Sequence, residues 1–77
     1  MSSAIKLLSE LKRGQRAIID SFTDYETSLK LLEMGCIPGA EVKMNSRAPF
    51  GCPITIIVND YTLSLRLEEA ATILVKS

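Results

Sequence analysis

The side chains of this sequence that could do chemistry are two cysteines and several carboxylates. The 77 residues contain no histidine, which excludes histidine-based acid–base catalysis, serine–histidine triads and most zinc or iron sites. Cys36 and Cys52 lack the Cys-x-x-Cys spacing of a metal or redox motif. Two thiolates on converging loops could bind a soft metal if a carboxylate such as Glu33 completed the shell, but no third ligand is obvious. We interpret each cysteine as a small hydrophobic residue and expect no metal or cofactor.

The remaining polar candidates do not form a catalytic set. The carboxylates that we considered fall on different predicted elements, and we interpret them as solvated charge: Asp20, Asp24, Glu26 and Glu33. Three glycines lack the strand-to-helix spacing of a phosphate-binding loop and are predicted to lie in turns: Gly35, Gly39 and Gly51. The sequence therefore predicts a protein that is not an enzyme.

Length and composition predict one small domain covering residues 1–77. At this size the chain buries about 60% of its unfolded surface, which leaves little room for a deep active site. Nine basic residues balance nine acidic residues, so nucleic acid is not expected as a partner. The sequence shows no apolar run of about 20 residues and no signal-peptide core, and two cysteines are too few for a disulfide scaffold. We expect a cytosolic protein.

The stretch from Leu29 to Gly39 contains the only helix predicted to be long enough to cover a sheet. The spacing of Leu29, Leu32 and Met34 predicts one broad apolar face. The side chains expected to face water are Lys30 and Glu33. Gly35 follows the last periodic residue, where a left-handed glycine ends a helix at no steric cost. At the other end, either Asp24 or Thr27 could be the N-cap.

The rest of the chain reads mainly as short strands. A short first helix is expected from Ser2 or Ser3, with Ile5 and Leu8 on its apolar side and Gly14 after its end. Five strands are predicted by alternation of apolar and polar residues, with a bulge near Ser21 and a hairpin turn at Asn59-Asp60: Gln15–Phe22, Glu41–Asn45, Pro53–Val58, Tyr61–Leu67 and Ile73–Val75. The segment Leu67–Ala71 is predicted to form a single helical turn.

These elements predict a mainly β fold with short helices. Five strands joined mostly by hairpins, with a helix inserted after the first strand, bury both ends of a sheet when the sheet curls into a small SH3-like barrel. An open sheet with the helix on one face is the alternative architecture.

The loop from Ala48 to Pro53 is the most informative candidate site. Pro49, Phe50 and Pro53 are apolar, although a loop that only connects strands should be polar. Either this loop covers the open end of the barrel or it is a contact surface. SH3-like barrels bind peptides in grooves lined by such loops, so the residues alone indicate a small, non-catalytic adaptor module.

Five motifs in order resemble a known family. They are Leu-x-x-Leu-x-x-Gly at 8–14, Leu-Leu-Glu-Met-Gly-x-x-Pro-Gly at 31–39, Ala-Pro-x-Gly-x-Pro-Ile at 48–54, Leu-x-Leu-Arg at 63–66 and Glu-Ala-x-x-Ile-x-Val at 69–75. Together they cover nearly the whole chain and resemble the ferrous iron transport protein A family, FeoA. The resemblance implies a cytosolic SH3-like domain that assists FeoB, a membrane transporter of ferrous iron with a cytosolic GTPase domain. The same fold also forms the C-terminal domain of iron- and manganese-dependent repressors.

The resemblance further implies a contact with the cytosolic part of an FeoB-type transporter, and contact with the membrane only through it. We expect this contact to involve the helix end and the loop: Leu32, Met34, Gly35, Cys36, Ala48, Pro49, Phe50, Gly51, Cys52 and Pro53. A weak homo-oligomer, with no surface assigned to it, is also compatible with the sequence. Two of these positions depart from the family pattern, because Cys36 replaces an aliphatic residue and Cys52 often replaces Asp. The second change removes a carboxylate that could cap the loop or meet a partner.

Two other functions are compatible with the residues. The first is a general SH3-like peptide-binding or regulatory module that is not tied to iron. The second is an iron-carrying chaperone, which would need metal ligands that this inventory barely supplies. A free-standing repressor is not expected, because no helix-turn-helix region fits in the chain.

Overall fold

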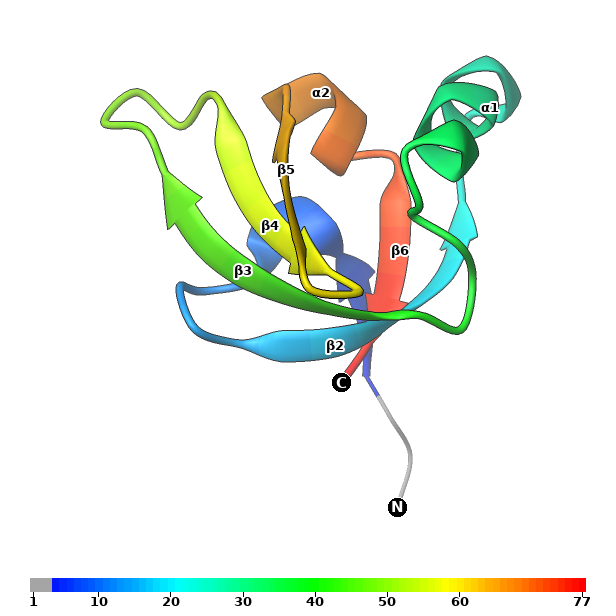
Figure 1. Cartoon of the computed structure of the whole chain (residues 1–77), viewed down its shortest axis with the longest axis horizontal. Coiled ribbons are helices and arrows are strands. Elements are labelled where there is room, and N and C mark those ends of the chain that lie inside the picture. The colour runs from blue at the N-terminus through cyan, green and yellow to red at the C-terminus, as the bar shows by residue number, and fades with distance from the viewer. Residues whose placement is uncertain (1–3) are drawn as a thin grey trace.

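The computed structural model describes residues 4–77, which form a curled six-stranded antiparallel sheet with short helices at its margins (Figure 1). The strands are β1 (Ile5–Leu7), β2 (Arg16–Phe22), β3 (Glu41–Arg47), β4 (Ile54–Val58), β5 (Tyr61–Leu65) and β6 (Ile73–Lys76). The helices are the 3₁₀ turn η1 (Leu8–Glu10), α1 (Tyr25–Glu33) and α2 (Leu67–Ala70). The strand order is β1-β6-β2-β3-β4-β5, so the two ends of the chain pair with each other.

The predicted first helix is wrong, and β1 takes its place. Ile5 pairs with Lys76 and Leu7 pairs with Leu74, so the segment is extended. The backbone then turns once through η1, which buries Leu8 while Ile5 stays 53% exposed. Strand pairing with β6 outweighs a helical spacing that is only a few residues long, as tertiary context commonly does. The predicted caps, Ser2 and Ser3, lie outside the described residues.

The other strands confirm the alternation in the sequence. The register of β2 against β6 shifts between Ile19 and Ser21, which places the bulge where it was predicted. Asn59 and Asp60 both have positive φ, at 50° and 67°, as a two-residue hairpin turn requires. The alternation in β5 predicts that Tyr61, Leu63 and Leu65 share the inward face. Leu65 is buried as predicted, but Tyr61 is 72% exposed.

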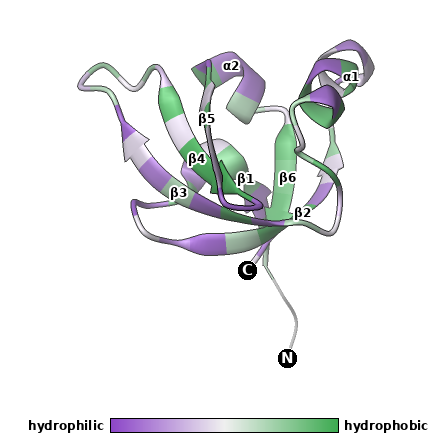
Figure 2. Ribbon diagram, in the orientation of Figure 1, coloured by the Kyte–Doolittle hydropathy of each residue, from purple (hydrophilic) through white to green (hydrophobic). Residues whose placement is uncertain are grey.

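The core is aliphatic and lies in the concave side of the sheet. Figure 2 shows hydrophobic residues alternating with polar ones along the strands. Its largest fully buried side chains come from all parts of the chain: Leu8, Leu11, Ile19, Leu31, Val42, Met44, Ile54, Ile56, Val58, Leu65, Ile73 and Val75. Half-buried strands of this kind form when one face packs inward and the other meets water.

The fold is the expected small SH3-like one, but the sheet is not closed into a barrel. Its two edges, β1 and β5, are not paired with each other. The helical turns fill the space between these edges, with Leu8 and Leu11 around η1 and Ala70 in α2 all fully buried. Side-chain packing therefore replaces the hydrogen bonds of a closed barrel. Among residues 4–77, no helix has both the length and the apolar character needed to cross a membrane.

Candidate functional site

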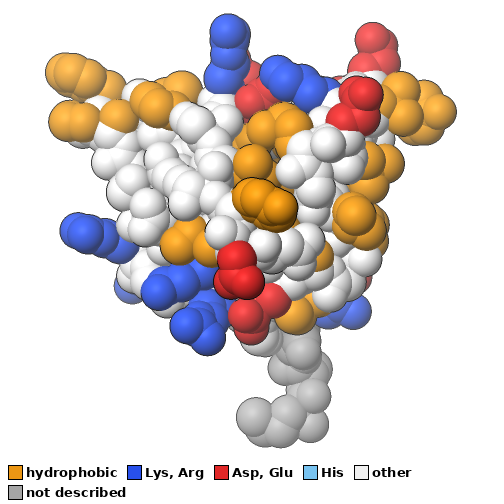
Figure 3. Space-filling model, in the orientation of Figure 1, with side chains coloured by type: hydrophobic (Ala, Val, Ile, Leu, Met, Phe, Trp, Pro, Cys, Tyr) orange, Lys and Arg blue, Asp and Glu red, His pale blue; other side chains and the backbone are white. Residues whose placement is uncertain are grey.

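The two segments singled out by the sequence lie at one end of the molecule. Figure 1 shows α1, α2 and the β3–β4 loop together at the end opposite the chain termini. We call this end, made of α1, α2 and the loop Ala48–Pro53, the candidate surface. In Figure 3, hydrophobic side chains gather at its two corners, over the loop and over α1, with charged side chains between them over α2.

The loop is held as a tight turn that projects its apolar side chains. The Gly51 amide donates to the Ala48 carbonyl at 2.8 Å, and the Ala48 amide donates to the Pro53 carbonyl at 3.1 Å. Pro49 and Phe50 therefore occupy the two central positions of a β-turn, where proline is favoured first. Gly51 has a φ of 85°, which glycine adopts without strain.

Phe50 consequently stands at the tip of the turn with 97% of its surface exposed. Because Phe50 is almost fully exposed, it does not cover the core. Of the two alternatives for this loop, Phe50 therefore does not support the one in which the loop covers the open end of the barrel. Burying a phenylalanine side chain is worth about 1.5–3 kcal/mol, and this energy is not used within the domain. An apolar group held out by a rigid turn is typical of a contact surface.

The ends of α1 are fixed by local hydrogen bonds. Asp24 is the N-cap, because its Oδ2 accepts from the Thr27 amide at 2.9 Å. Hydrogen bonding from the Thr27 side chain, followed by that from its amide, lowers the pKa of the Asp24 carboxyl. At the C-terminus, Gly35 has a φ of 101° and its amide donates to Leu32. The Cys36 amide donates back to the Leu31 carbonyl at 2.9 Å, which completes a Schellman motif.

Cys36 has a structural role in that motif. The hydrophobic contact of a Schellman motif joins the residue after the glycine to the last turn of the helix, and here Cys36 and Leu31 are both fully buried. Burial raises the pKa of the Cys36 thiol, which favours its protonated form. The predicted place of Cys36 in a contact surface is therefore replaced by a place in the core.

The buried face of α1 differs from the prediction. Leu31 and Ser28 pack inward, whereas Leu29 and Leu32 are 47% and 39% exposed. Tyr25, Leu29 and Leu32 follow one another at the i, i+4 and i+7 spacing of a single helix face. They therefore form an apolar stripe that faces solvent. The sequence contained this stripe, but its spacing alone could not say whether the domain or a partner covers it.

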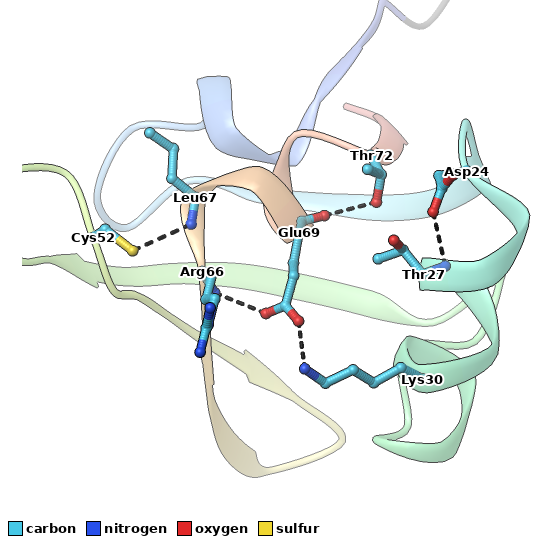
Figure 4. A network of polar contacts seen from close by, with 8 residues as sticks. All are labelled: Asp24, Thr27, Lys30, Cys52, Arg66, Leu67, Glu69 and Thr72. Carbon is cyan, nitrogen blue, oxygen red and sulfur yellow. Dashed lines mark hydrogen bonds and ion pairs between the residues drawn. The ribbon is translucent and has the colours of Figure 1, made fainter.

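The short helix α2 connects the two apolar corners of the candidate surface (Figure 4). On one side, Lys30 Nζ of α1 lies 2.6 Å from Glu69 Oε2, while Glu69 Oε1 accepts from the Arg66 amide at 2.9 Å. On the other side, the Leu67 amide lies 3.4 Å from Cys52 Sγ in the loop. The prediction missed this bridge, although a glutamate three residues after the start of a helical turn is half of the capping-box pattern.

Glu69 makes the bridge sensitive to acid. The hydrogen bond from Lys30, followed by that from the Arg66 amide, lowers the pKa of the Glu69 carboxyl below its ordinary 4.5. A lowered pKa in the folded state adds stability above the unfolded value, and this stability is lost as pH falls through the folded value. We expect Glu69→Gln to cost about 1 kcal/mol at pH 7 and almost nothing once the carboxyl is protonated.

Urea unfolding at pH 7 and at pH 3 measures this difference, with Glu68→Gln as the control at an exposed position of the same helix. An equal cost of Glu69→Gln at both pH values would contradict the role of its charge.

Cys52 is an exposed, free thiol that lies next to the start of α2. Sulfur accepts hydrogen bonds weakly, and its partner is the first amide of α2. We expect Cys52→Asp to raise the free energy of unfolding by about 0.5–1 kcal/mol, because a carboxylate there caps α2 and meets its positive end. Thermal unfolding tests this, and Cys52→Ala, expected to be almost neutral, is the matched control.

The contact residues predicted from the sequence thus form two groups separated by α2. Leu32, Met34 and Gly35 lie at the end of α1, and the loop residues lie at the other corner. Among the described residues 4–77, no group of three or more histidine, cysteine, aspartate or glutamate side chains is placed to hold a metal ion. The arrangement of exposed apolar side chains around a charged bridge suits binding of another molecule.

Comparisons with known proteins give this surface a context. No curated protein matches the sequence. Among solved structures, a FeoA-like protein from Clostridium acetobutylicum shares 30% identity with a TM-score of 0.86, over 97% of this chain and 87% of that one. A FeoA from Stenotrophomonas maltophilia, described as complexed with zinc and as an SH3 domain protein, shares 31% identity with a TM-score of 0.79, over 91% and 88% of the two chains.

A more distant comparison concerns the fold alone. A manganese-dependent transcriptional repressor shares 16% identity with a TM-score of 0.87, and this chain spans 44% of its length. The FeoA domain family model matches residues 6–77 of the present sequence. The motifs, the SH3-like fold and this match along nearly the whole chain agree, and the chain therefore belongs to the FeoA family, which is associated with ferrous iron transport.

Proposed function

We propose that this protein is a non-enzymatic accessory factor of ferrous iron uptake that binds the cytosolic GTPase region of an FeoB-type transporter through the candidate surface. It works in the cytoplasm and reaches the inner face of the membrane only when bound to the transporter. Membership of the FeoA family supports the link to iron transport. The observation that supports a binding role most directly is the nearly complete exposure of Phe50 at the tip of a rigid turn.

The geometry of the candidate surface supports binding at two points. Phe50 provides an aromatic anchor at one corner, and the stripe of Tyr25, Leu29 and Leu32 provides an apolar helix face at the other. Aromatic side chains dominate the binding energy of modest interfaces, and a helix face of this kind packs against another helix or a groove. The charged bridge through α2 fixes the two corners relative to each other.

We expect Phe50→Ala to weaken association with the transporter by about 2 kcal/mol while leaving the melting temperature almost unchanged. The physical reason is that Phe50 is exposed in the free protein, so its loss costs little until a partner covers it. Both quantities are measured on one sample, by thermal unfolding and by titration against the purified cytosolic region of the transporter.

Tyr61→Ala is the control, because Tyr61 is also an exposed aromatic residue but lies on β5, outside the candidate surface. A similar loss of binding for both variants, or unchanged binding for Phe50→Ala, would contradict the assignment. A general peptide-binding module would instead bind unrelated apolar peptides as well as the transporter, so a competition titration with such peptides separates the two functions.

A further inference from the structure

The strand β5 is a free edge of the sheet. It pairs with β4 on one side, and within residues 4–77 no strand pairs with its other side. The two-residue turn pairs Val58 with Tyr61, so the hydrogen-bonded positions of this ladder are Tyr61, Leu63 and Leu65. The amide and carbonyl groups of Thr62 and Ser64 therefore point outward, and no helix or loop crosses in front of β5 in Figure 1.

This edge has none of the features that normally prevent pairing with another strand. Tyr61–Leu65 contains no charged residue and no proline, and its register against β4 shows no bulge. The opposite edge of the sheet, β1, is only three residues long and carries Lys6. Thr62 and Ser64, the residues that carry the outward backbone groups, are both exposed.

We propose that β5 pairs with β5 of a second copy of this chain, antiparallel and centred on Leu63. In this register, Thr62 faces Ser64 of the second copy, and each of the two equivalent pairs exchanges two backbone hydrogen bonds. Leu63 faces its own counterpart. The arrangement is a symmetric dimer whose sheet runs continuously through both copies.

Charge complementarity supports a second copy as the occupant. The same register brings the end of each strand opposite the start of the other, so Asp60 of one copy lies beside Arg66 of the other at both ends of the ladder. Within residues 4–77, the ion pairs join Lys30 to Glu69 and Lys76 to Asp20, so neither Asp60 nor Arg66 is in direct contact with an opposite charge, although the Arg66 charge acts on Glu69 from further away. Tyr61, which is 72% exposed in the single chain, lies opposite Leu65 of the second copy, so the dimer buries part of its side chain.

A pair of charge reversals tests the register. Arg66→Glu alone places two acidic pairs in the dimer, and Asp60→Lys alone places two basic pairs, so each variant should self-associate about tenfold more weakly than the native chain. When the two variants are mixed, every pair becomes attractive and the heterodimer should form with nearly native affinity. Sedimentation equilibrium at low salt, up to millimolar protein, measures all four samples, with Arg13→Glu as the control of equal charge change.

The backbone contact is tested by Ser64→Pro, which removes an outward amide that no bond within the sheet uses and should abolish the dimer with little loss of stability. In the native chain, exchange of the Thr62 and Ser64 amides should slow as protein concentration rises. A native chain that stays monomeric, a dimer that survives Ser64→Pro, or variants that do not rescue each other would overturn the proposal. Protection of these amides only after addition of the transporter's cytosolic region would assign the edge to that partner instead.

Discussion

Leu31→Ala should lower the free energy of unfolding by about 2–5 kcal/mol, the cost of truncating a fully buried leucine. The effect is expected to be large for this chain because Leu31 is the only large fully buried side chain of α1. It also fills the Schellman motif beside Cys36. The free energy of unfolding of a small domain exceeds this cost by only a few kcal/mol. A sizeable unfolded fraction of the Leu31→Ala variant is therefore expected at 37 °C.

Leu32→Ala is the matched control, because Leu32 directly follows Leu31 on the same helix but is 39% exposed. Its expected cost is under about 1 kcal/mol. Urea unfolding of both variants measures the difference directly. Equal costs would mean that α1 packs through both leucines, and the exposed stripe would then lose its place in the proposed function.

Gly35→Val should destabilise the protein by about 1–3 kcal/mol, because a β-branched residue is strained at a φ of 101°. An added Cβ at Gly35 meets no atom within 4 Å, so the cost comes from the backbone conformation and not from a steric clash with neighbours. Melting temperature and urea midpoint both report the change.

Glu33→Val provides the comparison for this substitution, since it introduces the same side chain at the last helical residue of α1. The exposed position there should cost only about 0.5 kcal/mol, the difference in helix propensity. If Gly35→Val were no worse than Glu33→Val, the left-handed cap would not be needed to end the helix.

Local patterns in the sequence predicted the local structure well. The glycine after Met34, the Asn59-Asp60 turn and the alternation of inward Val42 and Met44 with polar residues each depend on neighbouring residues and backbone sterics, and the structure confirms all three. These features needed no knowledge of the rest of the chain.

The misses share a different cause. Ile5–Leu7 became a strand because β6, at the far end of the sequence, offers it a ladder. Leu31, and not Leu29, took the inward position in α1, where it joins a core built from residues distant in sequence. The bridge through Glu69 joins residues that are distant in sequence. The spacing of apolar residues cannot predict such contacts, because it describes the preference of one segment and not the segments that pack against it.

The pairing of β1 with β6 also determines how the molecule can be held. Because the Ser77 amide reaches the Ala4 carbonyl, at 3.3 Å, the two ends of the described chain lie side by side, opposite α1, α2 and the loop (Figure 1). A tag, fluorophore or surface linker at either end of the chain is therefore attached on the same side of the molecule. In both cases Phe50 and the helix stripe face away from the attachment point, toward the solution. Immobilisation through N- or C-terminal tags should give the same apparent affinity for a partner that binds at the opposite pole.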